Sequence, residues 1–299
     1  MKQVYTLTRA FGVLFLTIAI LVSCVDESET TDQSPVPVID PDAEGLTGNI
    51  VKYEGEIFSI PSPVQTAILI KKSGIEYNAE LLNDVGNSDK YINQFQKAMN
   101  MCVYGADLAY LSNFNNTRMS IEYFNAIEEL ADDLGIKNNI DVGILIRFNK
   151  NIEIQDSLYS LNAELYQEAN RYLQDNERND VASLILAGGW IEALHIIIDA
   201  AYDDTEIRTR VGEQRSALIS LVALLGKFED TRVTQVRDGL MELVTVYKEM
   251  EMSYTYAKPI TDADARTTYL NSKTQVDVLD EHLVQLKESV NAIRNTITG

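Results

Sequence analysis

The chain has 299 residues, of which 45 are acidic and 25 are basic, so its formal net charge at pH 7 is −20. Binding of nucleic-acid phosphates depends on Lys and Arg, so this charge excludes nucleic acids from the expected partners. The chain has only two cysteines and two histidines, too few for a disulfide framework or a thiolate metal site and few for histidine catalysis. No cofactor is expected.

Residues 1–23 predict a secretory signal peptide. Lys2 and Arg9 supply positive charge around the start of the segment, and a twelve-residue apolar run follows at 11–22 (FGVLFLTIAILV). A bilayer span needs about 20 apolar residues, so this run is short for a transmembrane helix and typical of a signal. The run ends in the letters LVSC, the last of which is Cys24.

The stretch LVSC resembles the lipobox of bacterial lipoproteins, with an aliphatic residue three before the cysteine and a small residue directly before it. The resemblance implies that Cys24 receives a diacylglycerol, becomes the mature N-terminus and is acylated on its amine. A single acyl chain holds a protein only marginally, whereas two or more give stable anchoring. The alternative is an ordinary signal peptide in which the cysteine is coincidental.

The residues that follow Cys24 indicate a location. Position 25 is Val rather than Asp, which by analogy with lipoprotein sorting favours the outer membrane. The acidic run Asp26, Glu27 and Glu29 resembles tags that send some Bacteroidetes-type lipoproteins to the cell surface. We therefore expect an outer-membrane lipoprotein that faces the periplasm or, as the tag favours, the cell surface.

Residues 24–48 predict a lipidated cysteine followed by a disordered tether. Positions 25–48 contain seven acidic residues, three prolines and no basic residue. Low hydrophobicity and like charges cannot offset the entropy of ordering, and proline with charge repulsion extends the segment. With Cys24 acylated, only Cys102 remains, so no internal disulfide is expected, and we expect Cys102 to be a small buried side chain.

We expect residues 49–299 to form one all-α domain. No proline occurs from 64 to 258, which fits long helices. A short extended N-terminal piece precedes a helix that Ser62 caps and Pro63 begins. Segment 140–154 is ambiguous between helix and strand. Further helices are predicted at about 89–112, 118–134, 156–175, 179–202, 205–228, 230–254 and 275–297.

Two arrangements accommodate these helices. One is a multi-helix bundle, and the other is an irregular helical-repeat array, although no repeat register is sustained. Two C-terminal stretches carry apolar residues at alternating spacings of three and four, as in coiled coils, and we expect an antiparallel pair within the chain. An intermolecular coiled coil is the alternative. The two seams are Val233, Val236, Leu240, Leu243, Tyr247, Met250 and Tyr254, and Val276, Leu279, Leu283, Leu286, Val290, Ile293 and Ile297.

The stretch LILAGGWIEALHIIIDAAY at 184–202 holds the only tryptophan and one of the two histidines. Glu192 and His195 share a helix face in the Glu-x-x-His spacing of di-iron carboxylate bundles. The second such motif is missing, because Leu279 lies three residues before His282. A mononuclear metal site with both histidines and a carboxylate is one alternative. We expect instead a hydrogen-bonded His195 at the edge of a packed face, and no metal or catalytic residue is assigned.

Gly188 and Gly189 lie in the interior of the same predicted helix, where each costs about 1 kcal/mol relative to Ala. They permit a neighbouring helix to approach closely, which we expect, or alternatively they border a ligand pocket with Trp190 as its wall. The candidate pocket consists of Gly188, Gly189, Trp190, Glu192 and His195.

Three stretches carry a further resemblance, namely FSIPSPVQTAILIKKSG, YGADLAYL and LAGGWIEALHI. Through them the body of the chain resembles a group of all-helical lipoproteins of the Bacteroidetes kind, which implies a fold and an envelope location but no activity. The expected function is that of an outer-membrane-anchored, non-catalytic binding or envelope-assembly module with a protein or peptide partner. The alternatives are a small-molecule-binding protein with a pocket near Trp190 and a carboxylate- or metal-dependent enzyme that uses Glu192 and His195.

Overall fold

The part of the chain that can be described begins after the predicted tether. The predicted signal peptide at 1–23, the lipidation of Cys24 and the tether at 24–48 all lie outside the described residues. By their contacts, the described residues belong to one unit, Val36–Gly299. The computed structural model describes residues 49–53, 56–60, 63–262, 267–269 and 273–299.

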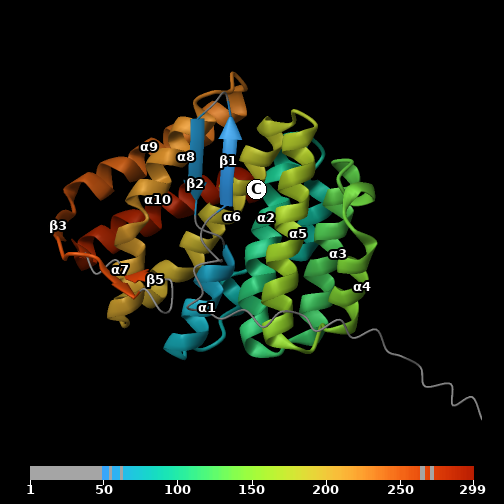
Figure 1. Ribbon diagram of the computed structural model, residues 1–299. Coiled ribbons are helices and arrows are strands. Elements are labelled where there is room, and N and C mark those ends of the chain that lie inside the picture. The colour runs from blue at the N-terminus through green and yellow to red at the C-terminus, as the bar shows by residue number, and fades with distance from the viewer. Residues whose placement is uncertain (1–48, 54–55, 61–62, 263–266, 270–272) are drawn as a thin grey trace, which may run out of the picture. The chain divides into compact units, whose positions relative to one another are not determined.

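The fold is all-α, as predicted, with ten α-helices and three two-stranded antiparallel ladders in the described residues (Figure 1). The helices are α1 (Pro63–Ser73), α2 (Gln94–Leu111), α3 (Thr117–Asp133), α4 (Val142–Lys150), α5 (Gln155–Asp175), α6 (Asn179–Ile198), α7 (Thr205–Glu213), α8 (Arg215–Leu225), α9 (Thr231–Glu249) and α10 (Asp280–Thr298). The strands pair as β1 (Asn49–Tyr53) with β2 (Glu56–Ile60), β3 (Glu251–Thr255) with β6 (Lys273–Asp277), and β4 (Ile260–Asp262) with β5 (Thr267–Tyr269).

Helix α6 forms the centre of the core. Every residue from Val181 to Leu194 is buried, so this stretch has no polar face. Helices α1, α2, α5, α7 and α10 pack around it. By length and composition, Asn179–Tyr202 is the one segment of the described chain that is apolar enough to cross a membrane. However, 94% of its apolar 18-residue window is buried within the chain, as in a core helix.

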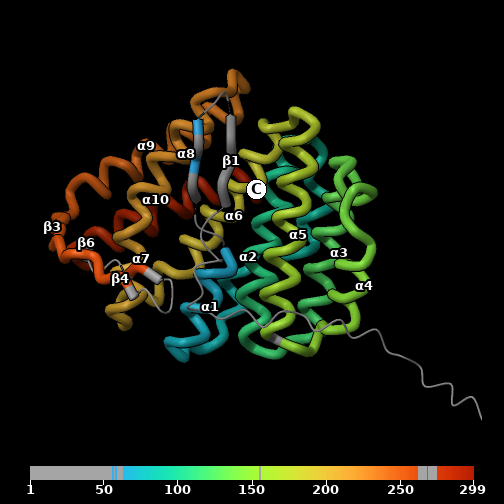
Figure 2. Tube along the Cα trace, viewed as in Figure 1, coloured from blue at the N-terminus to red at the C-terminus, as the bar shows by residue number. Residues whose placement is uncertain are grey.

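The helices form a bundle rather than a repeat array. Helices α2, α3, α4 and α5 pack on one side of α6, and α7, α8, α9 and α10 pack on the other (Figures 1 and 2). Helix α10 contacts both α6 and α2, so its packing partners are distant in the sequence. In a repeat array each unit contacts only its neighbours, which this arrangement does not follow.

The structure settles the secondary structure of one ambiguous segment and corrects that of another. The ambiguous segment 140–154 contains helix α4. The helix predicted at 205–228 is two helices, α7 and α8. They are separated by Gln214, where ψ is −9°. The expected extended N-terminal piece is the β1–β2 hairpin.

The paired helices α9 and α10 confirm most of the predicted apolar seams. The seam residues from Val233 to Met250 and from Leu283 to Ile297 are buried against other parts of the chain. Gly239 allows a close approach, since a Cβ there would lie 2.7 Å from Ile293 Cγ1.

The seams are shorter than predicted, because both helices stop where strands begin. Met250 has ψ 129° and ends α9, and Tyr254 lies in β3, where 66% of its surface is exposed. Leu279 precedes α10 and is also exposed, whereas Val276 lies in β6 and is buried. Thr and Tyr are frequent here and favour strands over helix. We call the strands β3, β4, β5 and β6, with their described connections, the arm.

Candidate functional sites

A buried ion pair connects α6 to α10. Glu192 is fully buried, and its two carboxylate oxygens accept hydrogen bonds from Arg294 Nε (2.6 Å) and Nη2 (2.7 Å). The same Nη2 donates to the carbonyl oxygen of Leu81 (3.1 Å). This geometry is the bidentate form that Arg adopts with carboxylates, and losing one partner of a buried pair costs about 3–5 kcal/mol.

Asp107 on α2 is a second, fully buried carboxyl group beside this pair. Its Oδ2 accepts a hydrogen bond from the backbone N–H of Asn83 (3.2 Å), and no donor in the described chain reaches Oδ1. Burial raises the pKa of Asp107 well above its ordinary value, and the negative charge of Glu192 raises it further. The protonated form of Asp107 is therefore favoured beside the ion pair of Glu192 and Arg294. We call Asp107, Glu192 and Arg294 the buried cluster.

His195 is held next to the buried cluster by both of its ring nitrogens. Nε2 lies 3.2 Å from the carbonyl oxygen of Leu81, and Nδ1 lies 2.9 Å from Oδ1 of Asn291. Burial lowers the pKa of His195, although the charge of Glu192 opposes this shift. The imidazole therefore bridges α6, α10 and the 3₁₀ helix η2 (Ala79–Leu81).

The other histidine makes a separate contact. His282 is buried in the first turn of α10, where Nδ1 accepts a hydrogen bond from the backbone N–H of Leu279 (3.1 Å). Each histidine is thus engaged in its own hydrogen bonding. In the described ranges, no group of three or more His, Cys, Asp and Glu side chains is arranged to hold a metal ion.

Sequence reasoning identified Glu192 and His195 but missed Asp107, Arg294 and Asn83. Asp107 is the only acidic residue in the otherwise apolar stretch CVYGADLAYL, and a lone charge on a predicted buried face is a signal for an internal partner. Arg294 is 187 positions from Asp107 in the sequence (294 − 107), so no local sequence pattern predicts that Arg294 lies beside these carboxyl groups.

The two glycines of α6 lie in a closed helix contact. A Cβ at Gly188 would lie 2.0 Å from the carbonyl oxygen of Met99, and one at Gly189 would lie 2.5 Å from Cys102 Sγ. Trp190 is 2% exposed, and its Nε1–H donates to Gln214 Oε1 (3.1 Å). The backbone of α2 occupies the space that the candidate pocket needs, and two hollows elsewhere in the described chain are lined by other residues.

One of these hollows is a narrow apolar cavity of about 50 Å³ between α2, α3 and α5. Cys102 lines it, and burial raises the pKa of this thiol to about 12, so it is a buried thiol rather than a nucleophile. Tyr166 also lines it, with a buried hydroxyl that has no hydrogen-bond partner in the described chain.

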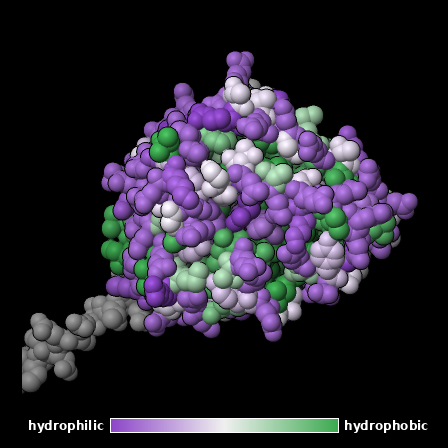
Figure 3. Space-filling model, turned by 180° about the vertical axis from the view of Figure 1, so that it is seen from behind, coloured by the Kyte–Doolittle hydropathy of each residue, from purple (hydrophilic) through white to green (hydrophobic). Residues whose placement is uncertain are grey.

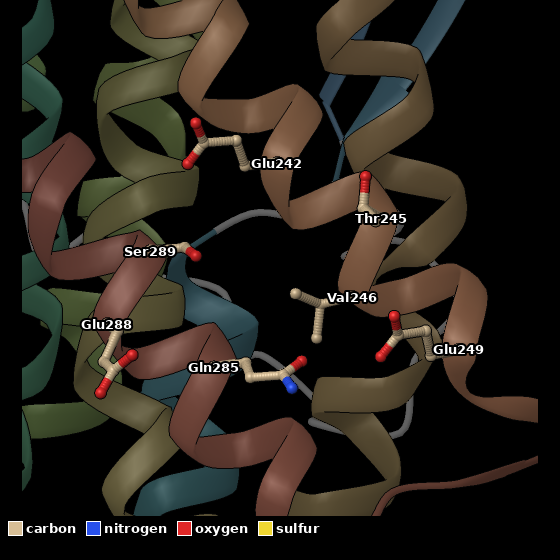
Figure 4. Close-up of a pocket in the computed structure, with 7 residues that line it drawn as sticks. All are labelled: Glu242, Thr245, Val246, Glu249, Gln285, Glu288 and Ser289. Atoms are coloured by element: carbon tan, nitrogen blue, oxygen red, sulfur yellow. The ribbon is translucent and has the colours of Figure 1, made fainter.

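The other hollow is an open acidic groove of about 340 Å³ between α9 and α10, which we call the groove. Figure 4 shows Glu242 and Glu249 at opposite ends of its α9 wall, with Glu288 on α10 and Val246 and Gln285 between them. None of the ion pairs between described residues includes any of these three glutamates. The groove therefore presents carboxylates whose cationic partners are not supplied by the described chain.

The arm adjoins the groove and exposes large apolar side chains. Glu249 lines the groove, and β3 begins two residues later with all five of its residues exposed. Met252, Tyr254 and Tyr256 are 48%, 66% and 68% exposed. The face in Figure 3 is mostly hydrophilic with scattered hydrophobic areas, which is usual for a protein surface, whereas three large apolar residues within one short strand segment are not.

The sites differ in what can reach them. The buried cluster and the glycine contact are closed by the chain itself, whereas the groove and the arm are open to another molecule.

No family model matches the chain, and no curated protein or solved structure is significantly similar to it.

Proposed function

We propose that the mature chain is a non-catalytic binding module, anchored in the outer membrane through acylated Cys24, that docks a Lys- and Arg-containing segment of a partner protein. The supporting observation is one continuous stretch of surface in which the acidic groove passes into the exposed arm at Glu249 and Glu251. A segment that combines cationic and apolar side chains complements both parts of this surface.

Charge favours a cationic partner. The three groove glutamates have no opposing cation in the described chain, and the net charge of −20 attracts cations over a longer range. Exposed ion pairs contribute only about 0–1 kcal/mol each, so stable docking also needs apolar contact. Met252 and Tyr254 supply it, since Met and Tyr are enriched at protein interfaces.

The proposed anchor accounts for membrane attachment without a basic surface. Removing residues 1–23 deletes Lys2 and Arg9 but no acidic residue, so the mature chain carries −20 − 2 = −22. Anionic headgroups repel such a chain, which leaves attachment to the acyl chains. We expect Cys24→Ser to move the protein from the membrane fraction to the soluble fraction of cells. Retention of this variant in the membrane fraction contradicts the anchor.

The docking surface is tested with a peptide of about ten residues that alternates Lys and Val, the Lys–Val peptide, titrated into the purified lipoprotein in detergent. The groove variant carries Glu242→Gln, Glu249→Gln and Glu288→Gln. We expect binding to weaken with added salt and the groove variant to bind about tenfold more weakly, because three ion pairs are lost.

A matched control removes the same number of exposed acidic charges elsewhere. The control variant carries Glu76→Gln, Glu80→Gln and Asp89→Asn, all of which are exposed and distant from the groove in the sequence. We expect it to bind within about twofold of the wild type. Equal weakening of both variants would show that net charge alone attracts the peptide and would overturn the proposed docking site.

A further inference from the structure

The arm offers an unpaired strand edge. Strand β3 pairs with β6 in the register Glu251↔Asp277 to Thr255↔Lys273, and this ladder has two strands in the described chain. One edge of β3 therefore carries backbone N–H and C=O groups without a neighbouring strand. Protected edges usually contain Lys, Pro or a bulge, and the β3 sequence EMSYT contains neither Lys nor Pro.

The side chains of this segment make one face of the strand apolar. Side chains alternate between the two faces of a strand, so Met252 and Tyr254 share a face, and Tyr256 follows at the same spacing. All three are exposed, and Ile260 at the start of β4 is exposed as well. An added strand could bury these side chains while pairing its own backbone with the free edge.

The charges at one end of β3 select the occupant. Glu251 begins β3, Asp277 lies opposite it in the ladder, and Glu249 lies two residues earlier in the groove. Glu281 is exposed in the first turn of α10, whereas the neighbouring Asp280 already pairs with Arg208 (2.6 Å). A second copy of this chain would bring the same acidic residues to the contact and be repelled, whereas a basic segment would be attracted.

We propose that β3 accepts an extended segment of the cationic partner as a third strand of the arm. Its apolar side chains cover Met252, Tyr254 and Tyr256, and its Lys or Arg side chains point toward Glu249, Glu251 and the groove. This inference rests on the proposed function and specifies how the partner binds: as a strand with alternating apolar and basic residues, held by main-chain hydrogen bonds.

Two N-methylated forms of the Lys–Val peptide test the strand. One is methylated on the backbone nitrogens of its Lys residues and the other on those of its Val residues, so each lacks the donors of one strand edge and keeps its charge. If β3 adds a strand, one form should bind about tenfold more weakly than the parent peptide and the other within about threefold. Equal binding of both forms and the parent overturns the strand and leaves charge-driven docking in the groove intact.

A variant of the arm gives a second readout. Met252→Thr with Tyr254→Thr keeps strand propensity and removes the apolar face, and we expect about tenfold weaker binding of the parent peptide. The matched control, Val142→Thr with Ile146→Thr, removes exposed apolar side chains from α4 and should bind as the wild type does. Equal weakening in both variants overturns the strand. Concentration-dependent dimerisation that the arm variant abolishes also overturns it, because the occupant would then be a second copy.

Discussion

Two regions of this chain contain clustered carboxyl groups, which are neutralised within the chain in one region and exposed without a cationic partner from the described chain in the other. In the buried cluster, Arg294 pairs with Glu192 within the chain, and burial favours the protonated form of Asp107. In the groove, three glutamates face solvent with no cation from the described chain against them. A carboxylate that is paired internally stabilises the fold, whereas carboxylates left unpaired beside exposed apolar residues favour binding another molecule.

The largest effect should come from breaking the buried cluster at its charged centre. Glu192→Gln removes the ion-pair partner of the Arg294 guanidinium, which is 14% exposed. We expect the free energy of unfolding to fall by about 3–5 kcal/mol, measured by urea denaturation at neutral pH.

The same cluster supplies a matched control. Asp107→Asn replaces a protonated carboxyl group with a neutral amide of similar shape, so we expect a loss of less than about 1.5 kcal/mol at neutral pH. A loss as large as that of Glu192→Gln would show that Asp107 is ionised and would contradict its raised pKa.

The next largest effect should come from the contact between α2 and α6. Gly188→Ala places a Cβ 2.0 Å from the carbonyl oxygen of Met99, so the backbone must shift, and we expect a loss of about 1–3 kcal/mol. Gly105→Ala is the control, because its Cβ would find its nearest neighbour, Cys102 Sγ, at 3.9 Å. This variant should be neutral or more stable by up to about 1 kcal/mol. Equal stabilities of the two variants in urea denaturation would contradict the closed contact.

Asp107 should also give stability a pH dependence of definite sign. Its folded-state pKa lies well above the ordinary value of 3.8, so between these values the folded chain keeps a proton that the unfolded chain has released. The stabilisation is fully present below pH about 4 and is lost as pH rises, by at most about 1.4 kcal/mol per pH unit. The unfolding free energy of wild type minus that of Asp107→Asn should therefore fall as the pH rises above about 4. A constant difference contradicts the assignment.

The smallest effect on stability should come from the open region. The groove variant removes three exposed charges that stabilise nothing in the described chain, so its free energy of unfolding should stay within about 0.5 kcal/mol of the wild type. It would even gain slightly if the three glutamates repel one another. A loss above about 2 kcal/mol would show that the groove glutamates have structural partners, and the contrast with the buried cluster would disappear.

Helix positions were predictable because they depend on local pattern. The absence of proline from 64 to 258 and the apolar periodicity predicted the helices, and Asn116 and Asp204 cap α3 and α7 at their beginnings as such residues do. The arm was missed because Tyr254 and Val276 extend the apolar spacing of α9 and α10 beyond the helix ends. Periodicity cannot distinguish such residues from strand residues, and the pairing of β3 with β6 is a non-local choice.

The sites were less predictable than the helices. The glycines at 188 and 189 indicated a close approach, but the sequence left an unidentified helix and a ligand as alternative neighbours. Glu192 and His195 were identifiable, yet their meaning depends on Arg294 and Asp107, which the bundle brings together from distant helices. The groove was not predicted because its glutamates belong to the polar faces of two helices. They line a common hollow only when the two helices pack side by side.

The contrast between the two regions is tested most directly by hydrogen–deuterium exchange of the full mature lipoprotein, with and without the Lys–Val peptide. We expect the peptide to slow amide exchange in β3 and in the parts of α9 and α10 that line the groove, and to leave α2 and α6 unchanged. Slowed exchange confined to α2 and α6, or no change anywhere at saturating peptide, would contradict the assignment of the open region to binding and of the buried cluster to the fold.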